Sequence, residues 1–432
     1  MKFYSLNNIA PDVSFKEAVI NGIAPDKGLY FPRSITPLPE TFWSDIEFLE
    51  DQDIAFMAIS QFVEDSLSKE ELKGILKRVL DFPFPIVELD EQTSILELFH
   101  GPTLAFKDVG ARFMANCLGI FSKGQNTEVT VLVATSGDTG GAVANGFIGV
   151  PGVKVVILYP SGKVSDIQER QLTTLGQNIS ALEVNGTFDD CQAMVKEAFL
   201  DKEITQQRKL TSANSINVAR WLPQMLYYIL AYKALKKKNM PIIFSVPSGN
   251  FGNICAGMVA HRLGMPVKQF IAATNSNDTV PNYLNTRTYL PKKSVPTISN
   301  AMDVGDPSNF IRIDTIYQKS FDLLSNHLSS YSFNDDQTKK AILEVYNNYN
   351  YVMDPHGAVG FLGLKEYQKD YPATLGVFLE TAHPVKFLSV VEETLNIKIP
   401  LPTEIEKLLH KQKVSIKIDK YEELKKYLLR DK

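Results

Sequence analysis

The sequence predicts an α/β fold in which parallel strands are covered by helices on both faces. From residue 129 onward, short apolar segments rich in β-branched residues alternate with helical segments. Continuously apolar strands are typical of parallel sheets that are buried on both faces. Two of these strands also run directly into glycine-rich turns that open helices, the arrangement in which α/β proteins hold anionic ligands.

Length and composition indicate a protein of several subdomains. A chain of 432 residues is too long for one simple core, so two or three subdomains are expected. The formal net charge of −4 gives no electrostatic basis for binding nucleic acid or an anionic membrane. No apolar run is long enough to span a bilayer, and residues 1–8 lack the residue order of a signal peptide.

Cysteine usage points to a reducing compartment. Cys117, Cys191 and Cys255 lie far apart, and none belongs to a CxxC pair. They cannot form a disulfide framework or a zinc site, so buried free thiols and no metal are expected. We therefore expect a cytoplasmic protein.

Residues 1–92 are predicted to be mainly helical. Ser68 and Glu71 have the spacing of a capping box, and the apolar residues that follow them lie on one helical face. Pro83 and Pro85 mark the boundary with the next region.

The stretch at residues 95–119 places a lysine at the mouth of a helix. An apolar segment breaks at His100-Gly101-Pro102, and a helical pattern begins at Lys107, beside Phe106. A lysine in such a position, near the positive end of the helix dipole, is costly to keep charged. Its neutral amine is the form that attacks carbonyls and makes Schiff bases. Lys107 is therefore a candidate catalytic residue, and the alternative is an ordinary solvated lysine.

The remaining elements follow from apolar runs and helical periodicity. Strands are predicted at residues 130–134, 153–160, 181–186, 241–250, 268–275 and 375–380. Helices are predicted at residues 142–147, 165–176, 189–200, 218–238 and 254–264, and after Asn334 or Asp335. Residues 283–310 are polar and predict a long loop, while residues 396–432, with ten Lys/Arg against six Asp/Glu, predict a solvated amphipathic tail.

The sequence VPSGNFGN at residues 246–253 predicts a phosphate site. It follows a strand and opens a helix, so backbone N–H groups and the helix dipole converge on one point. No Gly-Lys-Ser/Thr follows, which excludes a Walker A loop. A dinucleotide site is disfavoured because the third glycine is missing and the next strand ends at Asn275 rather than at a carboxylate. A cofactor with a single phosphate fits better; the alternative is a turn without a ligand.

A second strand-to-helix turn, ATSGDTGG at residues 134–141, is rich in hydroxyl groups. Thr135, Ser136 and Thr139 suit an anion such as a substrate carboxylate. The alternative is a tight turn capped by Ser136 or Asp138.

Two further segments carry candidate ligand-binding residues. In SANSINVAR, residues 212–220, Asn214 and Ser215 together with Arg220 could bind a phosphate, although Arg220 could equally be an exposed helix residue. In LETAHPVKF, residues 379–387, Thr381 follows the last apolar strand, where ligands of α/β proteins are bound. His383 is interpreted as a structural residue.

Seven motifs, taken together, resemble the threonine synthase family, in its longer bacterial and fungal form with an N-terminal helical domain. They run in order between about residues 21 and 387: HGPTLAFKD, ATSGDTG, SANSIN, VPSGNFGN, AATNSNDTVP, SNAMDVGDPSN and TAHPVKF. The resemblance implies the tryptophan-synthase-β-like fold of pyridoxal phosphate (PLP) enzymes, fold type II, with two open parallel-type sheets and flanking helices. It implies an N-terminal helical domain at 1–92, a catalytic α/β region at 93–395 with a smaller subdomain near 108–200, and a tail at 396–432.

The resemblance also implies an activity. It is the PLP-dependent conversion of O-phospho-L-homoserine and water to L-threonine and phosphate, by γ-elimination followed by β-addition of water, as the last step of threonine biosynthesis. Two alternatives are a related lyase, such as a serine/threonine dehydratase, and a non-catalytic phospho-ligand binding protein of the same fold. A monomer or homodimer that closes over its substrate is expected.

Residue roles follow from the matched motifs. Lys107 resembles the lysine that forms the Schiff base with the cofactor and then shuttles protons, and Thr381 resembles the hydroxyl partner of the pyridine nitrogen. The cradle for the cofactor phosphate is matched by Ser248, Gly249, Asn250, Phe251, Gly252 and Asn253. The substrate carboxylate is assigned to the turn with Thr135, Ser136, Asp138 and Thr139, and the substrate phosphate to Asn214, Ser215 and Arg220. His100 and Asp108 are expected to shape the loop before Lys107.

Overall fold

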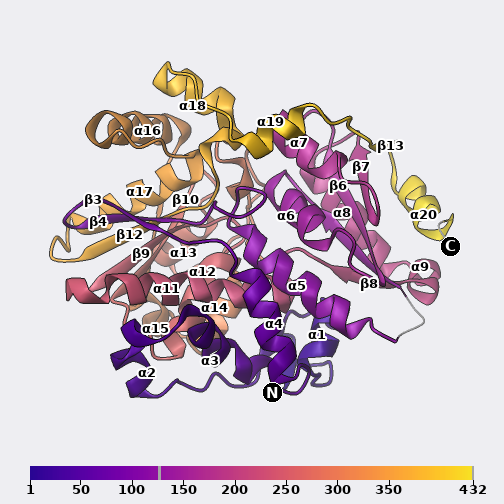
Figure 1. The fold of residues 1–432 in the computed structure, drawn as a ribbon, viewed down its shortest axis with the longest axis horizontal. Coiled ribbons are helices and arrows are strands. Elements are labelled where there is room, and N and C mark those ends of the chain that lie inside the picture. The colour runs from indigo at the N-terminus through magenta and orange to yellow at the C-terminus, as the bar shows by residue number, and fades with distance from the viewer. Residues whose placement is uncertain (125–127, 431–432) are drawn as a thin grey trace.

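The computed structural model describes residues 1–124 and 128–430. Two open sheets with flanking helices form the body of the protein, and a two-stranded sheet lies near the N-terminus (Figure 1). The strands are β1 (Phe3–Ser5), β2 (Tyr30–Pro32), β3 (Ile86–Asp90), β4 (Thr93–Glu97), β5 (Val129–Ala134), β6 (Val153–Pro160), β7 (Ile179–Val184), β8 (Lys209–Ser212), β9 (Ile242–Pro247), β10 (Gln269–Thr274), β11 (Leu328–Ser332), β12 (Leu375–Glu380) and β13 (Ile416–Ile418).

Helices cover both faces of the two large sheets. The α-helices are α1 (Phe15–Asn21), α2 (Glu40–Ser44), α3 (Asp51–Val63), α4 (Lys69–Val79), α5 (Lys107–Phe121), α6 (Asp138–Phe147), α7 (Asp166–Thr173), α8 (Phe188–Leu200), α9 (Lys202–Gln207), α10 (Val218–Trp221), α11 (Met225–Leu235), α12 (Gly252–Arg262), α13 (Thr279–Thr286), α14 (Phe310–Ile316), α15 (Phe321–Ser325), α16 (Asp335–Tyr349), α17 (Pro355–Gln368), α18 (Leu388–Leu395), α19 (Thr403–Leu409) and α20 (Tyr421–Arg430). The 3-10 helices are η1 (Ile46–Phe48), η2 (Leu222–Gln224), η3 (Lys236–Lys238), η4 (Asn300–Met302) and η5 (Pro384–Phe387).

The larger sheet has six strands in the order β11-β10-β9-β12-β4-β3. All neighbours are parallel except the edge strand β3, which pairs with β4 in the antiparallel sense. The smaller sheet, β13-β7-β6-β5-β8, is parallel throughout. The strands between β4 and β9 in the sequence all belong to the smaller sheet, so that body is inserted into the larger one. The predicted α/β fold with two parallel-type sheets is confirmed.

The N-terminal region contains the predicted helix with its capping box. Ser68 accepts a hydrogen bond from the backbone of Glu71, whose side chain accepts from the backbone of Ser68, at the start of α4. Within the region expected to be mainly helical, β3 is a strand of the larger sheet. Its residues follow the two prolines that end the helical pattern, and a short edge strand needs only one pairing partner.

The prediction of one long helix over residues 218–238 is wrong. The segment is divided into α10, η2, α11 and η3. Pro223 lies in the first turn of η2, where its missing N–H is tolerated, but it could not continue an α-helix from α10.

The C-terminal segment is amphipathic, as predicted, but it is packed against the smaller sheet and is not a solvated tail. β13 pairs in parallel with β7, and α20 packs Leu424 and Leu428 into the core of the smaller sheet. Lys425 forms ion pairs of 2.8 Å with Asp201 and Glu203. The charged residues therefore form the outer face of an amphipathic helix, whose apolar side is buried.

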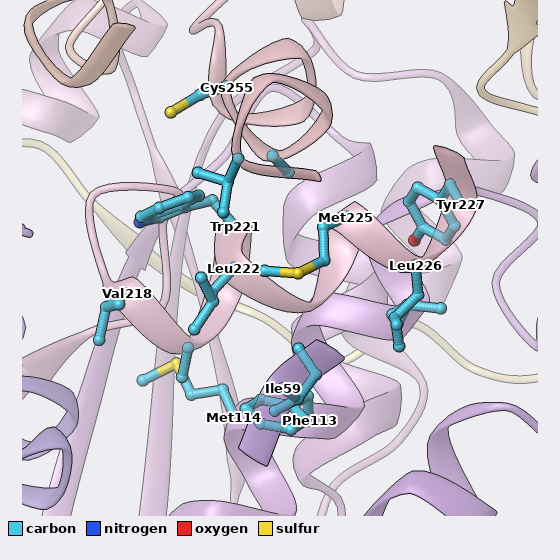
Figure 2. Close-up of a cluster of buried hydrophobic side chains, with 14 of the residues drawn as sticks. Ile59, Phe113, Met114, Val218, Trp221, Leu222, Met225, Leu226, Tyr227 and Cys255 are labelled. Carbon is cyan, nitrogen blue, oxygen red and sulfur yellow. The ribbon is translucent and has the colours of Figure 1, made fainter. Parts of the chain in front are cut away.

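Helix α5 is embedded in the main core, which ties it to the N-terminal helices and to α12. Figure 2 shows Phe113 and Met114 of α5 beside Ile59 of α3, with Trp221, Met225 and Cys255 above them. All six side chains are fully buried. Each buried side chain of this size contributes about 1.5–3 kcal/mol, so the residue at the head of α5 is held on a rigid element.

The three cysteines are free and buried, as expected. Among the described residues, no helix combines the length and the apolar character needed to cross a bilayer.

Candidate active site

Four strand ends bring the predicted residues to one region. Lys107 follows β4 after a nine-residue loop, residues 248–253 follow β9, and Thr381 follows β12. The carboxyl ends of adjacent parallel strands lie on the same edge of a sheet, where ligands bind in open α/β folds. Thr135 follows β5 in the smaller sheet, whose helix α6 contacts α5. The site is thus built between the two sheets.

The backbone fixes the position of Lys107 relative to Thr381. The N–H of Phe106 donates to the carbonyl of Thr381 at 2.9 Å, within a short antiparallel bridge between the two segments. The phenol of Tyr227 donates to the carbonyl of Phe106. Lys107 is therefore anchored by hydrogen bonds on both sides of the preceding residue.

The loop before Lys107 is held by Asp108. Its two carboxylate oxygens accept from the Thr103 backbone N–H at 2.9 Å and from the Thr103 hydroxyl at 2.6 Å. Gly101 allows this close approach, since a Cβ there would lie 2.5 Å from Asp108 Oδ2. Burial raises the pKa of Asp108 to about 6 despite these hydrogen bonds. His100 pairs with Glu97 at 2.7 Å at the surface. Asp108 thus shapes the loop, as predicted.

The pKa of Lys107 is lowered toward neutral pH. Its side chain is 16% exposed, and its Nζ lies 3.9 Å from Oδ2 of Asp138. Burial lowers the pKa of Lys107 to about 8; the negative charge of Asp138 opposes the shift, and the positive charges of Lys386 and Arg220 add to it. The tuning expected from the sequence is present, with burial as its main cause.

Asp138 is the counter-ion of two lysines. Its Oδ1 lies 2.7 Å from Nζ of Lys386 and accepts from Nε2 of Gln168 at 3.0 Å. Burial alone would raise the pKa of Asp138, but Lys386 and Lys107 hold it well below its ordinary value. The carboxylate therefore faces cations, and any anion at this turn would be held by other groups of the turn.

The turn after β5 depends on Thr135. Its hydroxyl oxygen accepts from the backbone N–H groups of Gly137 and Gly140, both at 2.9 Å. Gly137 has φ of +138° and no side chain caps α6 at this position, so the start of the helix is left open. Ser136 and Thr139 are half-buried beside it. Thr135 thus builds the turn, while Ser136 and Thr139 remain as hydroxyl groups for a ligand.

The loop after β9 has the geometry of an anion cradle. Phe251, with φ of +60°, precedes the eleven-residue helix α12, and no side chain caps this helix start. Asn253 donates to the carbonyl of Pro247 at 2.9 Å, which closes the loop. At Gly249 a Cβ would lie 2.8 Å from Cα of Met302. The N–H of Ile254 donates to Oδ1 of Asn253 at 2.9 Å, so the amides of Gly252 and Asn253 remain at this helix start for an anion.

The side chains of Asn214 and Ser215 form hydrogen bonds with other residues of the site. Asn214 donates from Nδ2 to the carbonyl of Ala134 at 3.0 Å, which joins its turn to the end of β5. The hydroxyl oxygen of Ser215 accepts from Nδ2 of Asn250 at 2.9 Å and of Asn309 at 3.0 Å. These polar side chains connect the turn at 212–217 to both predicted anion sites.

Arg220 is buried, which excludes the alternative of an exposed helix residue. The side chain is 2% exposed and donates to the carbonyl of Ala213, while its Nε has no hydrogen-bond partner. Burial lowers the pKa of Arg220 to about 10, so the guanidinium stays charged at neutral pH. A buried cation with an unpaired donor is a favourable position for an anion.

Three ionisable groups lie behind Thr381. The ring of His356 accepts from the backbone of Ala301 at Nε2, so its Nδ1 carries the proton and donates to Asp354 at 2.6 Å. Burial, and then the nearby charge of Asp354, raise the pKa of Glu380 well above its ordinary value. Glu380 is therefore protonated, and Asp354 carries the negative charge of this group.

A cleft with a volume of about 480 Å³ opens between the two bodies of the protein. Residues 162–168 of the smaller body line one wall. Residues 297, 298, 300 and 385–390 of the larger body line the other. Lys386 and Gln168, the two partners of Asp138 Oδ1, lie on this lining.

The site also contains residues that were not predicted from the sequence: Lys386, Gln168 and the Asp354–His356 pair. Lys386 belongs to a segment that follows a strand end, where a cation could have been expected to face a ligand. Asp354 precedes Pro355 at the start of α17, the pattern of a helix N-cap, and this pattern gives no sign of a buried ion pair. The pairing of Lys386 with Asp138 has no local signal in the sequence.

Comparisons with known proteins cover nearly the whole chain. Residues 87–378 match the family described as "Pyridoxal-phosphate dependent enzyme", residues 2–80 match "Threonine synthase N terminus", and residues 357–428 match "Threonine synthase, C-terminal". The threonine synthase of Buchnera aphidicola subsp. Acyrthosiphon pisum is 43% identical over 433 residues, which covers 99% of this chain and all of the relative.

Two solved structures are similar throughout. The crystal structure of threonine synthase from Escherichia coli has a TM-score of 0.93 at 39% identity and covers 100% of both chains. The structure of PLP-bound threonine synthase from Brucella melitensis has a TM-score of 0.92 at 32% identity and covers 99% of this chain and 98% of the other.

Proposed function

This chain belongs to the threonine synthase family of pyridoxal-phosphate-dependent enzymes, and from this premise we propose that it converts O-phospho-L-homoserine and water to L-threonine and phosphate. The observation that carries the proposal is the position of Lys107. Its amine is buried 3.9 Å from Asp138, the positive charge of Arg220 acts on it, and the N–H of the preceding Phe106 donates to the carbonyl of Thr381.

The residues present fit the cofactor. Lys107 supplies an amine with a pKa near 8 for the aldehyde, and the start of α12 supplies unpaired amides for one phosphate. Gly249 and Gly252 keep that loop free of side chains, since a Cβ at either position would contact neighbouring groups at about 3 Å or less. Thr381, with no charge of its own, would face the pyridine nitrogen. When bound, pyridoxal phosphate supplies the electron sink for carbanions beside the substrate amino group.

Lys107 is the residue that we assign to proton transfer. Its pKa of about 8 leaves about half of the amine uncharged near pH 8, and its backbone is fixed through Phe106. A neutral amine can remove a proton from carbon and, once charged, return it to a neighbouring carbon. This chemistry needs proton transfers at Cα, Cβ and Cγ of the substrate, and one mobile lysine side chain can reach successive atoms.

Arg220 is assigned to the departing phosphate. The leaving group carries two negative charges, so breaking the Cγ–O bond requires a cation in a site that excludes water. Arg220 supplies this charge, and its unpaired Nε is a donor that the protein itself does not use. Asn214 and Ser215, which lie on the same turn, would complete the contact or hold Arg220 in place.

The turn at residues 134–141 is assigned to the substrate carboxylate. Ser136 and Thr139 stand beside the open start of α6, while Thr135 keeps the turn in shape. Asp138 would not contact the carboxylate, because like charges repel; its role in the proposal is to balance Lys107 and Lys386.

Water must be excluded until the proton has returned to Cγ, since early water would intercept the reaction. The cleft between the two bodies is the route by which substrate would enter. Closing it would bring residues 162–168 toward residues 385–390 and shield the site.

A serine/threonine dehydratase of the same fold is the second candidate, and a non-catalytic binder the third. A dehydratase has no substrate phosphate to hold, so the buried guanidinium of Arg220, whose Nε has no hydrogen-bond partner, disfavours it. A binder would have no need for a lysine tuned to be neutral.

The test is a product assay with purified protein and added cofactor. Threonine and inorganic phosphate formed in equal amounts from O-phospho-L-homoserine would support the proposal. Ammonia and a keto acid from threonine, without activity on phosphohomoserine, would establish the dehydratase instead. A protein that stays colourless with added pyridoxal phosphate would contradict both enzyme assignments.

We also propose a cytoplasmic enzyme that acts as a monomer or homodimer. Three buried, unpaired cysteines support a reducing compartment. Light scattering during gel filtration measures the oligomeric state, and a larger assembly would contradict this part of the proposal.

A further inference from the structure

Lys386 is a fully buried lysine that no assigned role uses. Its side chain is 0% exposed, its Nζ lies 2.7 Å from Oδ1 of Asp138, and it donates to the carbonyl of Thr103 at 3.0 Å. A buried ammonium is costly unless it is paired and hydrogen-bonded. The chain keeps this cation beside the reactive lysine, so its placement calls for a functional reason.

The two oxygens of Asp138 have different partners. Oδ1 is occupied by Lys386 and by Nε2 of Gln168 at 3.0 Å. Oδ2 lies 3.9 Å from Nζ of Lys107, beyond hydrogen-bonding distance but close enough for charge to act. One carboxylate therefore serves two lysines, and only Lys386 is bonded to it.

We propose that Lys386 is a positioning residue, which holds Asp138 by one oxygen and so keeps that carboxylate from forming a hydrogen bond with Lys107. The proposal deepens the proposed function, because it rests on Lys107 being the reactive amine. In this role, Lys386 leaves the amine of Lys107 without a hydrogen bond to Asp138.

The physical reason is competition for one anion. Without Lys386, Lys107 would be the cation left in an ion pair with the buried carboxylate of Asp138 among the described residues. A charge-assisted hydrogen bond would then form, and it would stabilise the protonated amine. Lys386 prevents this by satisfying Asp138 first, and Gln168 supports the same orientation from α7.

Other charged groups around Lys107 do not replace this effect. Arg220 from α10 disfavours its protonated form, and Asp354 from the start of α17 favours it. His356 accepts from the backbone of Ala301 at Nε2 and is bonded to Asp354 through Nδ1. Among the described residues, Asp138 is the carboxylate that forms an ion pair with Lys107. The position of the Asp138 carboxylate therefore affects the protonation of Lys107.

The test measures the protonation of Lys107 in the cofactor-free protein. Cyanate is small and carbamylates neutral amines, so the rate at Lys107, followed by peptide mass spectrometry across pH, reports the neutral fraction. Lys386→Met is expected to move the pH midpoint upward and, for a shift of one unit, to slow carbamylation at pH 7 about tenfold. Asp138→Asn is expected to move the midpoint downward. The double variant separates positioning from simple charge removal: on the Asp138→Asn background, Lys386→Met should produce a much smaller shift.

Lys413→Met is the matched control, because Lys413 also pairs with a carboxylate, Asp166, at 2.7 Å, without being among the charges that act on Lys107. It should leave the midpoint of Lys107 unchanged. If Lys386→Met does not fold, Lys386→Gln serves instead, since it keeps a donor for Asp138 and removes the charge; a smaller upward shift is expected.

An unchanged or lowered midpoint in folded Lys386→Met or Lys386→Gln overturns the proposal. An equal shift on both backgrounds overturns the positioning role and leaves only direct repulsion between the lysines. The measurement does not depend on turnover. A shifted midpoint in a protein that makes no threonine would contradict the proposed function alone, and threonine synthesis with an unshifted midpoint would contradict this inference alone.

Discussion

Replacing Gly249 by alanine tests whether the loop after β9 binds the cofactor phosphate. An added Cβ would lie 2.8 Å from Cα of Met302 and 2.9 Å from the carbonyl oxygen of Ala301. Both are backbone atoms, so no side-chain rotation relieves the contact. The φ of Gly249 lies outside the left-handed region, and the substitution therefore adds a steric conflict without backbone strain.

The size of the effect follows from how the conflict is relieved. Inserting one methyl group into a packed position costs about 1–3 kcal/mol. If the loop moves, the cost falls on cofactor binding, and the dissociation constant for pyridoxal phosphate rises about 5- to 150-fold. If the segment at Ala301 and Met302 moves instead, the cost falls on the stability of the protein.

The assay titrates cofactor-free protein with pyridoxal phosphate and follows the visible absorption band, alongside thermal unfolding without cofactor. Gly74→Ala is the matched control. It lies within α4, the nearest atom to its added Cβ is Nη1 of Arg78 at 3.6 Å, and it is expected to stabilise the protein by about 0.5–1 kcal/mol without changing cofactor affinity. A Gly249→Ala protein that binds the cofactor as tightly as the parent and is equally stable would refute the reasoning about this loop.

Four further outcomes are expected. Lys107→Ala should keep bound cofactor through the phosphate loop after gel filtration but form no threonine; retained turnover would remove Lys107 from its assigned role. Arg220→Ala should raise KM for O-phospho-L-homoserine and lower kcat, with kcat/KM at least about tenfold lower because contacts to charged groups are worth about 1.5–3 kcal/mol; unchanged constants would contradict the phosphate assignment. The rate at which added cofactor restores colour should rise with pH and level off above about 8, because the pKa of Lys107 is lowered to about 8 and its deprotonated amine is the nucleophile; a rise that continues to about pH 10.4 would indicate an ordinary lysine. Thr135→Val should lower the free energy of unfolding by at least about 2 kcal/mol in chemical denaturation, since two buried amides, of Gly137 and Gly140, lose their acceptor; Thr205→Val, at a surface hydroxyl, should have little effect.

Features that arise from local patterns could be predicted from the sequence. Apolar runs gave strands such as β6 at the predicted residues 153–160, and the capping box at Ser68 formed as expected. The start of α5 at Lys107 was also predicted, because the helical periodicity begins there. In each case a few consecutive residues determine the structure, and tertiary contacts reinforce the same outcome.

Features that depend on distant partners could not be predicted. Asp138 was expected near a substrate carboxylate, yet its oxygens face two lysines, one of which lies 248 positions later in the chain and carries no sequence signal for the pairing. Ser215 was interpreted as a ligand contact, but its hydroxyl joins the side chains of Asn250 and Asn309. Polar residues of an active site can contact a ligand or support other residues, and composition does not distinguish these uses.

Two structural predictions were wrong although the sequence itself contained the residues that argued against them. Pro223 interrupts the segment 218–238, and a proline in that position is incompatible with one continuous helix. In the C-terminal segment, Leu424 and Leu428 are four residues apart, a spacing that places them on one buried helical face. The number of charged residues suggested a solvated segment, although the apolar stripe can be read from the sequence.

The pairing of β13 with β7 has a consequence for the growing chain on the ribosome. β7 is the strand that β13 covers, and the hydroxyl of Ser415, next to β13, bonds to Glu183, 232 residues earlier. At a synthesis rate of about 5–20 residues per second, the open edge of β7 waits roughly 10–50 s for its partner. During that time the smaller sheet presents unpaired backbone groups that another nascent chain could join. Fast translation of the intervening segment, or a chaperone that covers this edge, should therefore raise the yield of folded protein.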